Sequence, residues 1–108
     1  MSELNDSISS EYTKTPGPRY IWQGKYSGED FYQTVLKGLF ERALSSDSIL
    51  KINLDFTAGY GPSFLEESFG SLVRDFGLEA FKKHIAFESE EEPQLIDEIS
   101  EYALDASK

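Results

Sequence analysis

The chain has 108 residues, of which 20 are acidic and 10 basic, so its formal net charge at pH 7 is −10, and it has no cysteine. This length supports a single hydrophobic core, and the cysteine count excludes disulfides, thiolate metal sites and cysteine nucleophiles. The negative charge disfavours binding to nucleic acid or anionic lipid, and no apolar run reaches the roughly 20 residues that span a bilayer. We therefore expect a soluble cytoplasmic protein whose partners are proteins, with no nucleic-acid or membrane binding.

Residues 1–18 are rich in serine, threonine and acids, and they end in Pro-Gly-Pro. Because this segment has no apolar periodicity, we expect a flexible N-terminal arm, followed by one domain over residues 19–106. Arg19–Trp22 is aromatic and β-branched, which predicts a short strand. Ser27 has the properties of a helix N-cap, and two acids follow it in the first turn, where the helix dipole favours them.

The next strand is predicted at Ile49–Phe56, a short and mostly apolar run. Gly59 and Gly61 then mark a glycine-rich loop. Ser63 is the predicted N-cap of the following helix, because Glu66 three residues later completes a capping box.

Gly77 is typical of the residue that ends a helix, and a third strand is expected near His84–Glu88. Pro93 is expected at the first position of a C-terminal helix. Strand, helix and strand in succession favour a right-handed parallel crossover. The predicted fold class is therefore α/β, with a small mixed or parallel sheet of about three or four strands covered by helices.

The glycine-rich loop and the helix after it carry a motif. Thr57-Ala58-Gly59-Tyr60-Gly61 is followed by Ser63-Phe64-Leu65-Glu66-Glu67, and then by Phe69-Gly70 and Leu72-Val73-Arg74. This succession resembles the STAS-like family of domains of unknown function. The resemblance implies a fold similar to the STAS domains of anti-sigma-factor antagonists, and it brings no established activity.

By this resemblance Ser63 falls at the strand-loop-helix junction where STAS regulators carry a serine. In those regulators, phosphorylation of the serine abolishes binding to a partner kinase, so the implied partner is an ATPase of the histidine-kinase-like type. Two interpretations of Ser63 remain open, a helix cap alone or a phosphorylation switch. A phosphate would bring about two negative charges beside Glu66 and Glu67.

Asp55 lies at the carboxyl end of the predicted central strand, where open α/β sheets bind ligands. The alternative is an acceptor that holds the following loop. Gly59 and Gly61 precede a helix, as in phosphate cradles, but no P-loop lysine follows them. His84 is the single histidine, and we expect it to be structural. The sequence therefore predicts no metal, no cofactor and no enzymatic activity.

Tyr60 and Phe64, two aromatic residues beside glycines, are predicted to be partly exposed and to contact a partner, together with Glu66 and Glu67. We therefore expect a noncatalytic regulatory protein-interaction module that recognises its partner through Ala58–Glu67.

Two other functions stay open. One is a small-ligand-binding domain or enzyme that uses a pocket of Asp55, Tyr60 and Ser63. The other is a small acidic inhibitor of a basic or nucleic-acid-binding protein. The acidic residues that favour an inhibitor gather near the C-terminus: Glu88, Glu90, Glu91, Glu92, Asp97, Glu98, Glu101 and Asp105.

Overall fold

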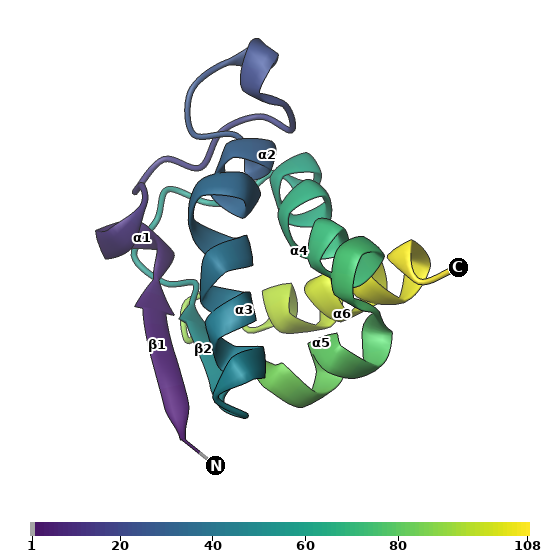
Figure 1. Ribbon diagram of the computed structural model, residues 1–108. Helices are drawn as coiled ribbons and strands as arrows, with labels where there is room; N and C mark the ends of the chain where they lie inside the picture. Colours follow the sequence, from purple (N-terminus) through teal and green to yellow (C-terminus); the bar gives the residue numbers. More distant parts are fainter. Residues whose placement is uncertain (1) are drawn as a thin grey trace.

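The computed structural model describes residues 2–108. At its centre is a three-stranded parallel sheet in the order β1 (Glu3–Ser7), β2 (Ile49–Asn53), β3 (Ile85–Glu88). Because the strands run in one direction, their carboxyl ends lie at the same end of the molecule, the upper end in Figure 1. The predicted α/β class with a small parallel sheet is confirmed.

The N-terminal segment is part of the sheet. β1 pairs with β2 along its whole length and leads into helix α1 (Ile8–Glu11), in which Ile8 is fully buried. The predicted arm over residues 1–18 is therefore wrong for this part. A short, polar edge strand lacks the apolar alternation by which strands are identified in sequence.

The strand predicted at Arg19–Trp22 is also absent. The chain forms one turn of 3₁₀ helix instead, η1 (Ile21–Gln23). The backbone N–H of Gly17 donates to Tyr26 O, and that of Gly28 donates to Pro18 O, both at 2.9 Å. These bonds turn the segment back on itself, so it cannot extend along the sheet.

A helix in three consecutive parts follows: α2 (Gly28–Phe31), the π-helical η2 (Tyr32–Leu36) and α3 (Lys37–Ser45). As predicted, Ser27 is the N-cap, because its hydroxyl accepts the N–H of Asp30 at 3.0 Å.

β2 ends at Asn53, earlier than predicted, and Phe56 is 68% exposed with a φ of 69°. The loop leads to α4 (Pro62–Phe76), and Gly77 separates α4 from α5 as predicted. The remaining helices are α5 (Leu78–His84), before β3, and α6 (Gln94–Ala106), after it.

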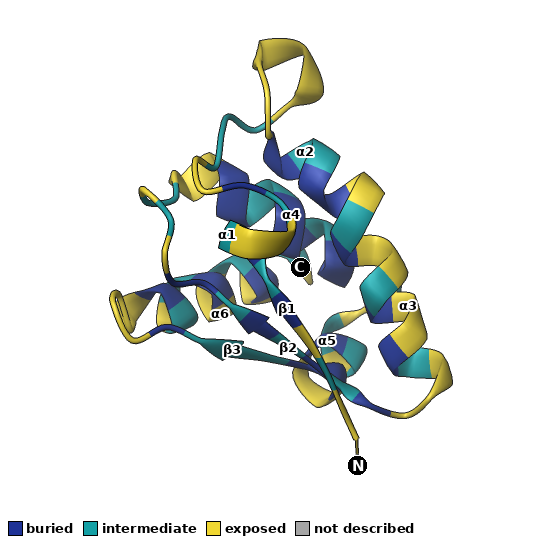
Figure 2. Ribbon diagram, turned by 90° about the vertical axis from the view of Figure 1, so that its left-hand side faces the viewer, coloured by how far each residue is buried: buried dark blue, intermediate teal, exposed yellow. Residues whose placement is uncertain are grey.

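The helices α3, α4, α5 and α6 lie on one side of the sheet (Figures 1 and 2). Leu50 and Ile52 of β2 are fully buried, as are the rings of Phe31, Phe40 and Phe69. The opposite face is polar and carries the ion pair of Lys51 and Glu88 at 3.2 Å. None of the helices between residues 2 and 108 has the length and apolarity that crossing a membrane requires.

Candidate interaction surface

Asp55 connects the ends of two strands. It is 4% exposed, and its Oδ1 accepts the backbone N–H groups of Glu90 and Glu91 at 3.0 Å. Glu91 Oε1 in turn accepts the N–H of Phe56 at 2.8 Å. Asp55 is therefore a backbone acceptor, and it holds the loop after β3 rather than the loop that follows it in sequence.

Phe64 and Tyr60 do not form an exposed aromatic pair. Phe64 is fully buried, with its ring 5.8 Å from that of Phe31, so its predicted role in contacting a partner is wrong. Tyr60 is half-buried, and its hydroxyl donates to Leu54 O at 2.9 Å. Burial raises the pKa of Tyr60 to about 12. Both rings pack the loop onto the core.

Ser63 is exposed in the first turn of α4 and does not cap it. The N-cap is Gly61, and Pro62 follows at the start of the helix, where its fixed φ is favourable. The predicted capping box of Ser63 and Glu66 is therefore wrong, because Pro62 moves the helix start upstream. Gly59 has a φ of 125°, and a Cβ at Gly59 or Gly61 would meet no atom within 4 Å. The outer side of this loop is open.

Glu66 and Glu67 are held in an ion-pair network. Arg19 Nη1 pairs with Glu66 Oε1 and lies 3.4 Å from Glu67 Oε1, and Arg74 Nη1 lies 2.9 Å from Glu66 Oε2. Burial acts to raise the pKa of Glu66, but the hydrogen bonds from Arg74 and Arg19 outweigh it and lower this pKa. The network joins the segment before α2 to α4, so both carboxylates are already engaged within the molecule.

The most exposed large aromatic side chain lies in residues 19–26, which we call the aromatic loop. Trp22 is 80% exposed, and its ring stacks on that of Tyr20 at 6.2 Å. Ile21 and Tyr26 are also exposed, and Figure 2 shows the loop standing clear of the fold at the top. The sequence signal for a loop was present, because a Pro-Gly-Pro run and a glycine bracket these aromatics.

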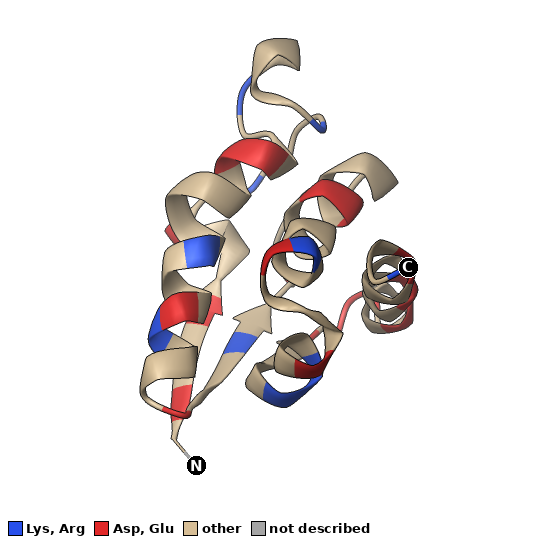
Figure 3. Cartoon of the chain, turned by 45° about the vertical axis from the view of Figure 1, so that its right-hand side comes forward, with Lys and Arg blue, Asp and Glu red and all other residues tan. Residues whose placement is uncertain are grey.

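The other sequence candidates make structural contacts or lie dispersed. His84 is buried, with its Nδ1 2.8 Å from Ser48 O. Of the acidic residues near the C-terminus, Glu88 is the last residue of β3, and the others lie on α6 and on the segment leading into it (Figure 3). Across residues 2–108, no group of three or more histidine or acidic side chains is placed to hold a metal ion.

Residues 27–95 match the model of a protein family described as a STAS-like domain of unknown function (DUF4325). The matched segment is more than half of the 108-residue chain. The chain belongs to this family. The STAS-like resemblance of the glycine-rich loop is thereby confirmed. Searches of the curated proteins and of the solved structures gave no match.

Within this STAS-like domain, the matched segment begins at the cap residue Ser27 and ends in α6. It includes Asp55, Ser63 and the ion pair of Glu66 with Arg74. The aromatic loop with Trp22 precedes it. The family match thus covers the helices from α2 to α5 and the loops at the carboxyl ends of β2 and β3, whereas most of α6 and the aromatic loop lie outside it.

Proposed function

We propose that this STAS-like domain is a noncatalytic regulatory module that binds a protein partner through the aromatic loop and the neighbouring start of α4. The observation that carries the proposal is the exposure of Trp22, at 80%, beside the exposed Tyr20 and Ile21. Clustered exposed aromatics are typical anchors of protein interfaces. The proposed recognition surface is therefore centred on the aromatic loop, and of the predicted Ala58–Glu67 it keeps only the start of α4.

The aromatic loop is held in place at its base, which suits it to binding. Glu29 Oε1 accepts the N–H of Ile21 at 2.8 Å, and the N–H of Glu29 donates to Arg19 O at 2.9 Å. Gln23 Oε1 accepts the N–H of Tyr20 at 2.9 Å. Because these bonds already order the loop, it loses little conformational freedom when a partner binds.

A cleft of about 510 Å³ lies against the aromatic loop. Its lining includes Ile21, Gly24, Tyr26 and Asp30. Cavities in this size range hold small ligands or single side chains. In the proposed complex, Trp22 contacts the partner and one partner side chain enters this cleft.

Ser63 supplies the regulatory switch in this proposal. It is exposed one helical turn before Glu66, whose carboxylate holds Arg19 at the base of the aromatic loop. A phosphate on Ser63 adds about two negative charges, is repelled by Glu66 and competes with Glu66 for Arg19. Phosphorylation then loosens the loop from α4 and weakens partner binding.

The noncatalytic part of the proposal is supported by how the polar side chains near the sheet are used. Asp55 accepts backbone N–H bonds from Glu90 and Glu91, and His84 contacts Ser48 O. Asp55 and His84, the residues that a catalytic site would use, therefore make structural contacts with the backbone. By resemblance to STAS regulators, the proposed partner is an ATPase of the histidine-kinase-like type.

The test is calorimetric titration of such a purified ATPase with the wild-type chain and with two single variants. Trp22→Ala is expected to weaken binding about tenfold or more. Leu104→Ala removes a side chain that is 50% exposed on α6 and is expected to leave binding unchanged. Equal affinity of the two variants would contradict the proposed surface, and no binding by the wild type would contradict the partner class.

A further inference from the structure

Asp6 is a buried carboxylate whose Oδ2 has no hydrogen-bond partner within residues 2–108. The residue is 9% exposed, and its register partner on β2 is the apolar Ile52. Burial, and then the negative charge of Glu11, raise the pKa of Asp6. A buried carboxyl oxygen without a partner is unfavourable, so Asp6 lacks a cationic or hydrogen-bonding group at this position.

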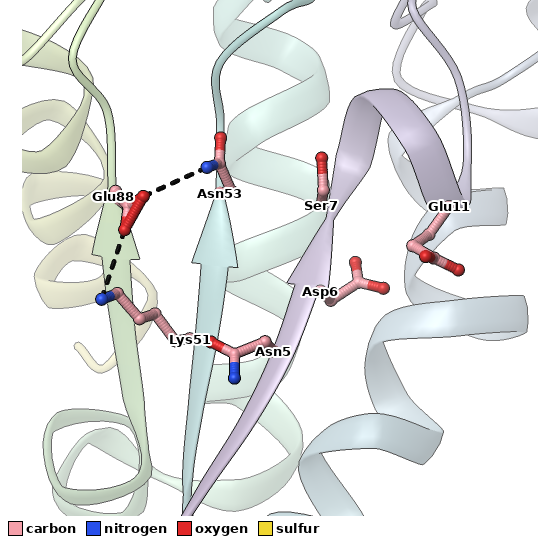
Figure 4. A pocket seen from close by; sticks show the side chains of 7 residues that line it. All are labelled: Asn5, Asp6, Ser7, Glu11, Lys51, Asn53 and Glu88. Atoms are coloured by element: carbon pink, nitrogen blue, oxygen red, sulfur yellow. Dashed lines mark hydrogen bonds and ion pairs between the residues drawn. The ribbon is translucent and has the colours of Figure 1, made fainter.

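Asp6 borders a cleft of about 410 Å³ against the face of η2 and α3. Glu11 shares the acidic end of the cleft, and Val35 and Leu39 form its apolar wall. Figure 4 shows a neighbouring pocket that shares Asp6 and Glu11 with this cleft, and in it both carboxyl groups lie on one side of β1, turned away from Lys51. The cleft therefore has two chemically different ends.

Gly38 keeps the apolar wall of this cleft open. It lines the cleft between Val35 and Leu39, and a Cβ placed there would meet no atom within 4 Å. Arg42 lies about one turn further along the same helix and is exposed. Arg42 is a cation that also lines the cleft, and no ion pair joins it to Asp6 or Glu11 within residues 2–108.

We propose that this cleft binds the side chain of an arginine or lysine on a protein partner. The charged head meets Asp6 and Glu11, and the methylene stem lies along Val35 and Leu39. Long basic side chains bury their stems on apolar surface in this way, and hydrogen bonds between charged groups are the stronger kind. The net charge of −10 favours a basic partner. The inference rests on the proposed function only in taking the ligand to be a protein.

The test is an NMR titration of the full chain with the peptide acetyl-Gly-Arg-Gly-amide. The same peptide with citrulline in place of arginine keeps the shape and removes the charge. The arginine peptide is expected to shift the amide signals of Val35, Gly38 and Leu39 and to lower the pKa of Asp6. The citrulline peptide is expected to do neither.

Single variants locate the binding. Asp6→Asn and Gly38→Leu, which fills the cleft, are each expected to weaken arginine-peptide binding about tenfold or more. Glu3→Gln removes the same charge from an exposed position of β1 and is expected to bind as the wild type does. Trp22→Ala is also expected to bind normally, so failure of this cleft and failure of the aromatic loop are distinguishable.

Three results would overturn the proposal. The first is equal binding of the citrulline peptide, and the second is wild-type affinity in Asp6→Asn. The third is binding that emerges only in Arg42→Ala, because Arg42 would then fill the cleft of the native chain.

Discussion

Glu66 and Arg74 are paired at 2.9 Å across Gly70, which lies between them on α4. Residues eight apart on a helix share a face but lie about 12 Å apart along the axis, so their side chains must meet above the residue between them. A Cβ at Gly70 would lie 2.7 Å from Glu66 Oε2 and 3.1 Å from Arg74 Nη1. The absence of a side chain at Gly70 therefore leaves room for the pair.

Gly70→Ala is expected to displace this ion pair and to raise the pKa of Glu66 toward its ordinary value of 4.5. The melting temperature should change little, because a gain in helix propensity of about 1 kcal/mol offsets the loss of a pair worth up to about 1 kcal/mol. Carboxyl NMR titration measures the pKa. A Glu66 pKa that stays at its wild-type value would show that Gly70 has no part in forming the pair.

Glu66 should also make stability depend on pH. Its pKa in the folded chain is lowered from the ordinary value of 4.5, so the ionised form stabilises the fold. This contribution is present above the ordinary pKa and is lost as the pH falls through the lowered one. In urea unfolding, Glu66→Gln should have a lower free energy of unfolding than the wild type at neutral pH. This difference should disappear as the pH is lowered. Glu101→Gln, an exposed change on α6, is the control, and an equal pH dependence of the two variants would argue against the network.

Replacing Gly28 and Gly38 by alanine should change the free energy of unfolding in opposite directions. A Cβ at Gly28 would lie 2.5 Å from Phe64 O, a backbone atom, because α2 packs closely on α4 there. Gly28→Ala is expected to lower the free energy of unfolding by about 1 to 3 kcal/mol. Gly38→Ala adds a methyl group in open space and should raise it by about 0.5 to 1 kcal/mol. Chemical denaturation measures the free energy of unfolding of both variants. A Gly28→Ala variant as stable as the wild type would refute the close approach of α2 and α4.

Phe64 and Trp22 provide a matched test of core against surface. Phe64 is fully buried and Trp22 is 80% exposed. Phe64→Ala is expected to cost about 3 to 5 kcal/mol of stability, whereas Trp22→Ala should change it by less than about 0.5 kcal/mol. If thermal unfolding instead shows a large loss for Trp22→Ala, the aromatic loop is a structural element and its proposed role in binding fails.

The predicted elements that the structure confirms are those stabilised by their own apolar pattern. The central strand carries Leu50 and Ile52, and the helix after the glycine-rich loop carries Leu65, Phe69 and Leu72 at helical spacing. Burial of such faces is the main favourable contribution to folding. The spacing of apolar residues in the sequence is therefore enough to predict these elements.

The missed features depend on neighbours that a local pattern does not contain. β1 has only Leu4 as an apolar residue and exists because β2 pairs with it. Pro62, by contrast, is a helix-start signal within the local sequence, and with α4 beginning there the N-cap is Gly61 rather than Ser63. Trp22 is exposed because backbone bonds close the loop around it rather than extending it. Each of these outcomes is set by contacts between segments distant in sequence or by a single proline.

Trp22 is the single tryptophan of the chain, so its fluorescence reports on the aromatic loop without any label. The decisive measurement is the Trp22 emission, recorded with acrylamide quenching, while a tryptophan-free variant of the proposed ATPase partner is added. If the aromatic loop binds the partner, emission moves to shorter wavelength and quenching falls as the complex forms, and phosphorylation of Ser63 shifts this transition to higher partner concentration. A complex that forms with normal affinity while Trp22 keeps the emission and quenching of the free chain would contradict binding through this loop.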